Sequence, residues 1–117
     1  MGQQQEKTVA EVLEAAAALI EPEGRWTQGA YYRDANGREI YADRREAACF
    51  CALGAIRIAG DYDASGLPDL NPAAQVLEGV LDTGVGIHEW NDAPGRTQAE
   101  VVAKLREASA VARERGL

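Results

Sequence analysis

The sequence has only one histidine, two cysteines and one phenylalanine. A single His88 and a Cys49-x-Cys51 pair split across two faces of a predicted helix cannot supply the four converging ligands of a structural zinc site. The glycines stand singly at turn-like positions, and none forms the glycine-rich loop between strand and helix that cradles phosphate groups. We therefore expect neither a metal ion nor a cofactor.

Long apolar runs are also missing. No uninterrupted stretch approaches the roughly 20 residues that a helix needs to cross a bilayer. The first residues, Met-Gly-Gln-Gln-Gln-Glu-Lys, are polar and do not resemble a signal peptide. These features predict a cytoplasmic protein without membrane contact, in which the two thiols stay reduced.

Basic side chains are outnumbered: 12 Lys and Arg stand against 19 Asp and Glu, which gives a net charge of −7. Direct nucleic-acid binding is therefore not expected, because it depends on clustered Lys and Arg. Only residues 96–117 are mildly basic, with five basic and three acidic side chains. A protein partner fits this balance better, and a protein that mimics nucleic acid stays open as a further possibility. The balance says nothing about the oligomeric state.

At 117 residues the chain fits one domain, residues 1–117, with residues 1–7 as a polar tail. Thr8-Val-Ala-Glu11 and Thr97-Gln-Ala-Glu100 each have the form of a capping box that opens an amphipathic helix. Asn71 followed by Pro72 predicts the start of another helix. A short link over residues 87–92, with room for one helical turn, precedes the last helix.

The most apolar stretch, residues 47–59, contains one charged residue, Arg57. Read as a helix it is apolar on nearly every side, which is typical of a helix inside a domain. The spacing of Asp43 and Glu46 predicts that this central helix begins near Asp43, and Gly60 is a suitable C-terminal cap. Its small residues would let neighbouring helices approach closely. Arg57 is expected to mark its outlet to solvent.

The segment between the first and central helices predicts a short hairpin. Residues 25–33 and 38–41 are rich in side chains that favour strands, and Asn36-Gly37 between them is a strong turn signal. Residues 61–70 are loop-like in composition. The expected fold is therefore α+β: a mainly helical single domain of four helices, with a short β-hairpin between helices 1 and 2.

One enzymatic hypothesis fits the sequence. Cys51 or Cys49, followed by His88 and then Asn91 or Asp92, repeats the thiol, imidazole and amide or carboxylate order of several cysteine hydrolases. Catalysis would need an exposed thiol near a helix N-terminus, where its pKa is lowered. Cys51 instead stands among alanines in the predicted helix, so we expect it to be buried and unreactive, and no residue is assigned as catalytic.

The segment 90–97 is more distinctive, because it places a large aromatic, two short polar side chains and an arginine around the forced turn at Pro94-Gly95. We expect a structural role: Trp90 anchors the segment, Asn91 or Asp92 binds backbone N–H groups, and Arg96 pairs with a carboxylate. The segment would then dock the last helix onto the central one. If it binds a partner instead, the candidate binding residues are Trp26, Trp90, Asn91, Asp92 and Arg96.

Three motifs stand out: a Trp-containing segment at residues 26–30, Cys-Ala-Leu-Gly-Ala at residues 51–55, and Trp-Asn-Asp-x-x-Gly-Arg-Thr-x-x-Glu-Val at residues 90–101. In these motifs the chain resembles an uncharacterised family of small bacterial and phage-encoded proteins, known only as a domain of unknown function. The resemblance covers most of residues 8–112 and implies a shared architecture and a phage or prophage setting. It implies no activity, cofactor or catalytic residue.

The sequence therefore favours a non-enzymatic, acidic protein-interaction domain, accessory to phage or mobile-element biology. A small cysteine-dependent hydrolase or transferase is the alternative. The reactivity of the thiols separates the two, because an exposed thiol of low pKa is alkylated quickly at neutral pH.

Overall fold

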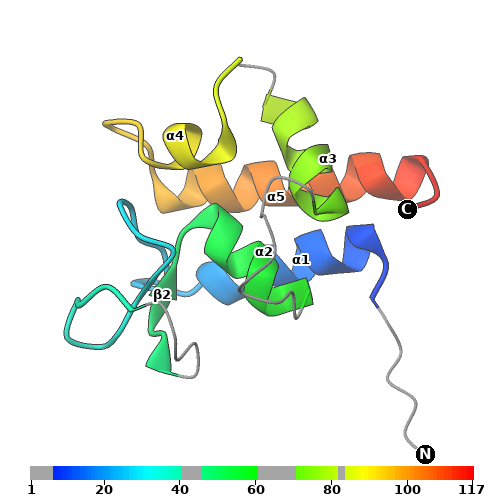
Figure 1. Ribbon diagram of the computed structural model, residues 1–117. Helices are drawn as coiled ribbons and strands as arrows, with labels where there is room; N and C mark the ends of the chain where they lie inside the picture. The colour runs from blue at the N-terminus through cyan, green and yellow to red at the C-terminus, as the bar shows by residue number, and fades with distance from the viewer. Residues whose placement is uncertain (1–6, 41–45, 61–70, 82–83) are drawn as a thin grey trace, which may run out of the picture.

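The computed structural model describes residues 7–40, 46–60, 71–81 and 84–117 (Figure 1). The elements in chain order are α1 (Val9–Ile20), β1 (Tyr32–Arg33), β2 (Cys49–Phe50), α2 (Ala52–Gly60), α3 (Pro72–Leu81), α4 (Ile87–Asn91) and α5 (Gln98–Glu114). The α+β prediction is confirmed: the described part is mainly helical, with one small antiparallel sheet. The short helix α4 occupies the link in which one helical turn was expected.

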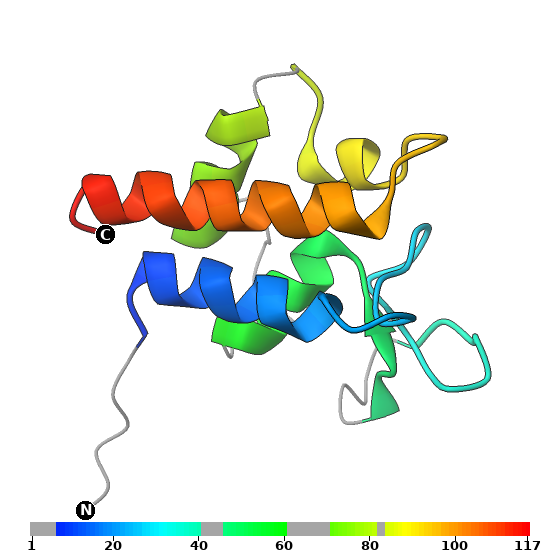
Figure 2. The same cartoon turned by 180° about the vertical axis from the view of Figure 1, so that it is seen from behind.

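The two capped helices, α1 and α5, lie antiparallel and side by side along their lengths (Figures 1 and 2). Both predicted capping boxes are present, since Thr8 with Glu11 and Thr97 with Glu100 exchange side-chain and backbone hydrogen bonds. Small residues let the two helices approach closely, and inside the contact the Ser109 hydroxyl donates to the Ala10 carbonyl at 2.8 Å. The fully buried residues of the two helices are Leu13, Ala16, Ala17, Ile20, Val101, Leu105, Ala108 and Ala112.

The predicted central helix is wrong in its first half. The helix α2 begins at Ala52, and Cys49–Phe50 form the strand β2, in which Phe50 pairs with Tyr32 and Cys49 with Arg33. The reason is a set of long-range backbone hydrogen bonds: the Phe50 N–H donates to the Arg25 carbonyl at 2.8 Å, and the Phe50 carbonyl accepts from Thr27 at 3.0 Å. A local helix would lose these bonds.

The predicted hairpin is present around its turn, where the Asp34 N–H donates to the Arg38 carbonyl at 2.9 Å and the Ile40 N–H to the Tyr32 carbonyl at 3.1 Å. Gly37 has a φ of 82°, and its N–H donates to the Asp34 carbonyl at 3.0 Å. The returning segment makes one isolated bridge, between Arg33 and Glu39, while the sheet partner of β1 is β2. Several expectations lie partly or wholly outside the described residues: the tail at residues 1–6, the end of the return strand at residue 41, the cap at Asp43 and the loop at residues 61–70.

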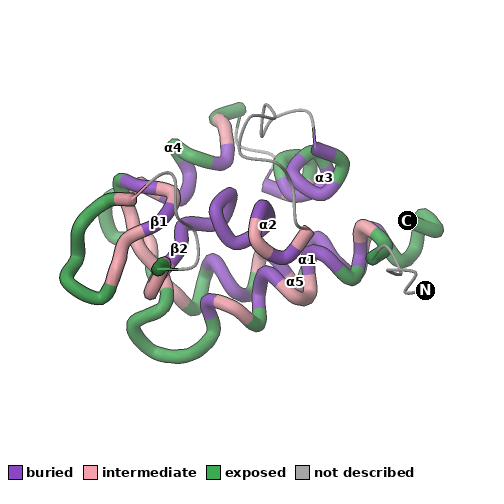
Figure 3. Tube along the Cα trace, turned by 60° about the horizontal axis from the view of Figure 1, so that its bottom comes forward, coloured by how far each residue is buried: buried purple, intermediate pink, exposed green. Residues whose placement is uncertain are grey.

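The helix α2 is buried along most of its length at the centre of the molecule (Figure 3). Arg57 does not mark an outlet to solvent: it is only 8% exposed, and its guanidinium lies 4.9 Å from the centre of the Tyr31 ring. A planar guanidinium can be buried against an aromatic face in this way. The close approach expected at the small residues occurs at Gly54, where a Cβ would overlap the Tyr31 carbonyl oxygen. At Gly54 the neighbour is therefore the backbone just before β1 and not another helix.

The remaining helices close the core. Asn71 caps α3 as predicted, because its Oδ1 accepts from the Ala74 N–H at 2.9 Å. The last helix, α5, packs on α1 and then on α3, so the expectation that it docks onto the central helix is wrong.

Among the large apolar side chains that the structure describes, only Val85 and Leu117 are exposed. In the described part of the chain, no helix has the length and apolar character needed to cross a membrane.

Candidate functional site

The segment 86–97 owes its shape to a helix that is stopped early. The helix α4 has five residues, and the turn after it is closed by the Arg96 N–H, which donates to the Ala93 carbonyl at 3.0 Å. Pro94 cannot donate a backbone hydrogen bond, and Gly95 has a φ of 83°, which favours glycine. Thr97 then caps α5. This forced turn fixes where the side chains before it point.

Asn91 is fully buried, and its amide makes all four hydrogen bonds that it can make. Its Oδ1 accepts from the Trp26 indole N–H at 2.8 Å and from the Ala52 N–H at 3.0 Å. Its Nδ2 donates to the Thr27 carbonyl at 3.1 Å and to Asp92 Oδ1 at 3.0 Å. Because Ala52 opens α2, the Asn91 side chain satisfies a backbone donor that a helix start leaves without a partner. One amide thus joins the end of α4, the start of α2 and the segment around Trp26.

Asp92 and Gln28 extend these contacts. Asp92 Oδ1 also accepts from the Gly29 N–H at 3.0 Å. Gln28 Nε2 donates to the carbonyls of Asn91 and Ala93 at 2.9 and 3.1 Å. The prediction that Asn91 and Asp92 bind backbone N–H groups is confirmed. The role of Gln28 was missed, because nothing local to it indicates that residues 26–29 meet α4. We call Trp26, Gln28, Asn91 and Asp92 the Asn91 cluster.

Trp90 and Arg96 form the outer part of the segment. Trp90 is 5% exposed, and the Arg96 guanidinium lies 4.1 Å from the centre of its ring. Arg96 Nε donates to the Trp90 carbonyl at 3.0 Å, and Arg96 Nη1 lies 3.5 Å from Glu100 Oε2. Trp90 is therefore an apolar anchor, and Arg96 pairs with a carboxylate, as expected.

Cys51 lies directly before α2, with its carbonyl accepting from the Ala55 N–H and its Sγ from the Gly54 N–H at 3.3 Å. This is the helix-start position that the catalytic alternative requires. The sequence did not indicate it, because the predicted helix began near Asp43 and placed Cys51 in its interior. The thiol is nevertheless 1% exposed, and burial raises its pKa to about 11, although backbone N–H groups of Gly54 and Leu53 favour the thiolate. The prediction that Cys51 is buried is confirmed, and at neutral pH it carries its proton.

The other members of the catalytic alternative point elsewhere. Cys49 is partly buried in β2, with its Sγ 4.0 Å from the Arg33 carbonyl oxygen. The His88 ring, whose side chain is 50% exposed, lies 5.9 Å from the Tyr31 ring, and its Nε2 lies 3.4 Å from Asp92 Oδ2. The hydrogen bonds that the structure describes connect His88 to neither thiol. No group of three or more metal-ligating side chains is found within residues 7–40, 46–60, 71–81 and 84–117.

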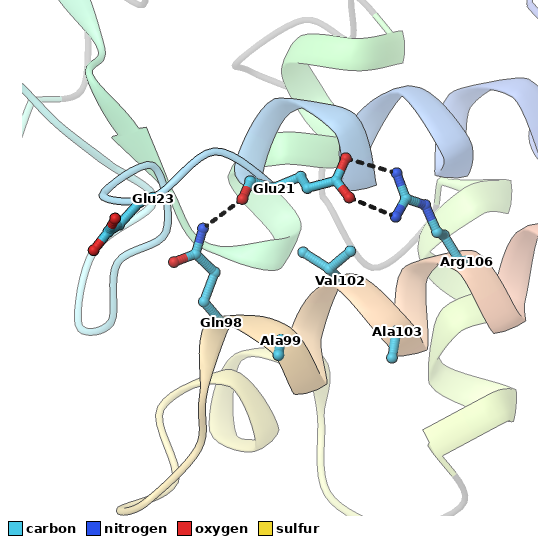
Figure 4. Close-up of a pocket in the computed structure, with 7 residues that line it drawn as sticks. All are labelled: Glu21, Glu23, Gln98, Ala99, Val102, Ala103 and Arg106. Carbon is cyan, nitrogen blue, oxygen red and sulfur yellow. Dashed lines mark hydrogen bonds and ion pairs between the residues drawn. The ribbon is translucent and has the colours of Figure 1, made fainter.

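An open groove lies between the chain that leaves α1 and the first turns of α5 (Figure 4). Its volume is about 570 Å³. We call it the α1–α5 groove, and its lining residues are Glu21, Glu23, Gln98, Ala99, Val102, Ala103 and Arg106. None of these was predicted as a site residue. The available signal was the pair Ala99 and Ala103, which are apolar but fall outside the buried stripe of the last helix.

Ion pairs and amide contacts hold the two sides of the groove together. Arg106 donates from Nη1 and Nη2 to the two carboxylate oxygens of Glu21, each at 2.9 Å, and from Nε to Glu14 at 3.1 Å. Hydrogen bonding and charge from Arg106 hold the pKa of the Glu21 carboxyl below its ordinary value. The Gln98 amide donates to the carbonyl of Ile20, the last residue of α1, and to that of Pro22 beyond it at 2.7 Å. The groove is therefore formed before anything binds in it.

A family model described as "Family of unknown function (DUF6197)" matches residues 4–111, so the chain belongs to this family. Comparison with curated proteins gave no match, and comparison with solved structures gave none either.

Proposed function

We propose that this member of DUF6197 is a non-enzymatic, acidic protein-interaction domain that works in the cytoplasm with a protein partner. We place it in the biology of phages or mobile elements, on the resemblance of the motifs at residues 51–55 and 90–101. The net charge of −7 supports a partner that is itself basic where it binds.

The observation that carries the proposal is the way the chain distributes its polar and apolar groups. The distinctive polar residue of the sequence, Asn91, has no hydrogen-bonding capacity left for a ligand. The best placed nucleophile, Cys51, is buried and protonated at neutral pH. The α1–α5 groove offers an open apolar surface instead, while almost all large apolar side chains in the described part of the chain are covered. Such a surface is suited to binding, and its lining contains no thiol, hydroxyl, amine or imidazole group.

The test compares binding with thiol chemistry in the same protein. The full chain is used to capture partners from its native host, with mass-spectrometric identification, beside a variant that carries both Cys51→Ala and His88→Ala. We expect both proteins to capture the same partner with the same affinity, and a thiol-directed probe to leave native Cys51 unlabelled. Rapid labelling of Cys51, with turnover of a thioester or ester substrate that the variant lacks, would overturn the proposal.

A further inference from the structure

The α1–α5 groove combines an apolar floor with an acidic rim. Ala99 and Ala103 are exposed on α5, and Val102 between them is 9% exposed. Because the side chains of Ala99 and Ala103 are small, they do not fill the space between α5 and the chain that leaves α1 (Figure 4). Its volume is within the range of pockets that bind small ligands or a few side chains.

The charges around the floor are predominantly negative. Two carboxylates, Glu14 and Glu21, bind the guanidinium of Arg106, and a third, Glu23, lies at the other end of the groove (Figure 4). Arg106 is already bound by Glu14 and by both oxygens of Glu21, so it has little capacity for an incoming anion. Glu23 forms no ion pair with any residue that the structure describes and is exposed. The groove therefore favours a cation next to an apolar group.

We infer that the α1–α5 groove binds a short basic segment of the partner protein, with an apolar side chain over Ala99, Val102 and Ala103 and a Lys or Arg beside Glu23. The inference rests on the proposed function and names the surface and the chemistry of the partner. A second copy of the chain fits less well, because each copy carries a net charge of −7 and the two would repel. The contacts of Gln98 and Arg106 hold the groove open in advance, which lowers the entropic cost of binding.

The experiment uses the purified full chain and a display library of random-sequence peptides. Enriched peptides are synthesised, and their affinities are measured by fluorescence anisotropy at low and at physiological ionic strength. We expect the enriched sequences to share a Lys or Arg near a large apolar residue, and their binding to weaken as salt screens the charges.

Two pairs of variants locate the binding. Ala103→Arg fills the groove with a bulky cation, and Ala110→Arg makes the same change at an exposed position of the same helix that does not line it. We expect Ala103→Arg to weaken binding at least about tenfold, as at the centre of an interface, and Ala110→Arg to leave it unchanged. Glu23→Gln should weaken binding about two- to fivefold and reduce its salt dependence, as the loss of one exposed ion pair does. Glu89→Gln, on α4, should do neither.

The outcomes separate this inference from the proposed function. If a host protein is captured equally well by the wild type and by Ala103→Arg, the proposed function stands and the groove is not the binding surface. Enriched peptides without basic residues, or binding insensitive to Glu23→Gln, would overturn the inferred chemistry. Self-association that Ala103→Arg abolishes would show that a second copy occupies the groove, and would overturn it as well. Failure to capture any host partner would count against the proposed function itself.

Discussion

The Asn91 cluster and the α1–α5 groove make opposite use of their residues. In the cluster, side chains with strong chemistry are turned inward, and the amide of Asn91 uses its two donors and its two acceptor sites on neighbouring groups. In the groove, alanines with no chemistry of their own leave an open surface that carboxylates surround. The comparison teaches that a distinctive motif can serve the fold while an undistinguished stretch provides the surface for binding.

The two regions should also differ in which property a substitution affects, stability or binding. A buried polar group that loses its partner is costly, because water cannot replace the lost hydrogen bond. An exposed alanine on a helix can be replaced with little effect on folding. Variants of the cluster should therefore lower stability, and variants of the groove should lower binding.

The largest effect is expected for Trp90→Ala. Removal of a large side chain that is 5% exposed should lower the free energy of unfolding by about 3–5 kcal/mol, measured by chemical denaturation. Trp90→Phe keeps an aromatic face for Arg96 and should cost much less. A stable Trp90→Ala protein that has lost its partner would instead make Trp90 a binding residue.

Asn91→Ala comes next. It leaves the Trp26 indole N–H and the Ala52 N–H without an acceptor, and we expect a loss of about 3 kcal/mol in the free energy of unfolding. Gln28→Ala serves as the control, because Gln28 is only partly buried and the Ala93 carbonyl that it binds still accepts from the Arg96 N–H. If both variants lose the same free energy of unfolding, the buried Asn91 amide contributes no more to stability than the partly buried Gln28 amide.

Two helical glycines sharpen the contrast between packed and open positions. Gly54→Ala would force a Cβ against the Tyr31 carbonyl oxygen, and should lower the free energy of unfolding by about 1–3 kcal/mol. Gly79→Ala, in α3, meets no atom within 4 Å and should raise it by up to about 1 kcal/mol. Thermal melts of the two variants give the answer directly, and a stabilised Gly54→Ala protein would contradict the packing described here.

The smallest effect concerns pH. Burial raises the pKa of Cys51 to about 11, above that of an unfolded thiol, so the unfolded chain releases this proton first. The contribution of the protonated Cys51 thiol to the free energy of unfolding is complete below the pKa of the unfolded thiol, and it is lost as the pH rises toward 11. One pH unit above the unfolded pKa, the wild type should have lost about 1.4 kcal/mol relative to Cys51→Ala. The same comparison with Cys49→Ala tests the assignment. If Cys49→Ala removes the pH-dependent loss of stability and Cys51→Ala does not, the loss arises from Cys49 and the assignment to Cys51 is wrong.

Local signals explain which parts of the fold could be predicted. The capping boxes at Thr8 and Thr97 and the Asn71-Pro72 start act within one helical turn, so the sequence predicts them correctly. The start of α2 was predicted wrongly, because Phe50 is held in a strand by Arg25 and Thr27, more than twenty residues away. An apolar run fits a buried strand as well as a buried helix, and periodicity does not separate them.

The same distinction applies to the sites. The roles of Asn91 and Asp92 as acceptors for backbone N–H groups follow from residue type and the neighbouring turn, but their partners, Ala52 and Gly29, depend on how the chain folds back. The groove could not be predicted, since it exists only because α5 lies antiparallel along α1. Ala99 and Ala103 stand outside the buried stripe of the last helix, which indicates a small apolar surface on it but not the groove that α1 completes.

One measurement tests the central claim, that the cluster builds the fold and the groove binds the partner. Protein carrying isotope-labelled alanine methyl groups is titrated with an enriched peptide, and the methyl resonances are followed by NMR. The account predicts shifts at Ala99 and Ala103, in the groove, and none at Ala52 and Ala93, beside the Asn91 cluster. Shifts at Ala52 and Ala93 with none at Ala99 and Ala103 would contradict it.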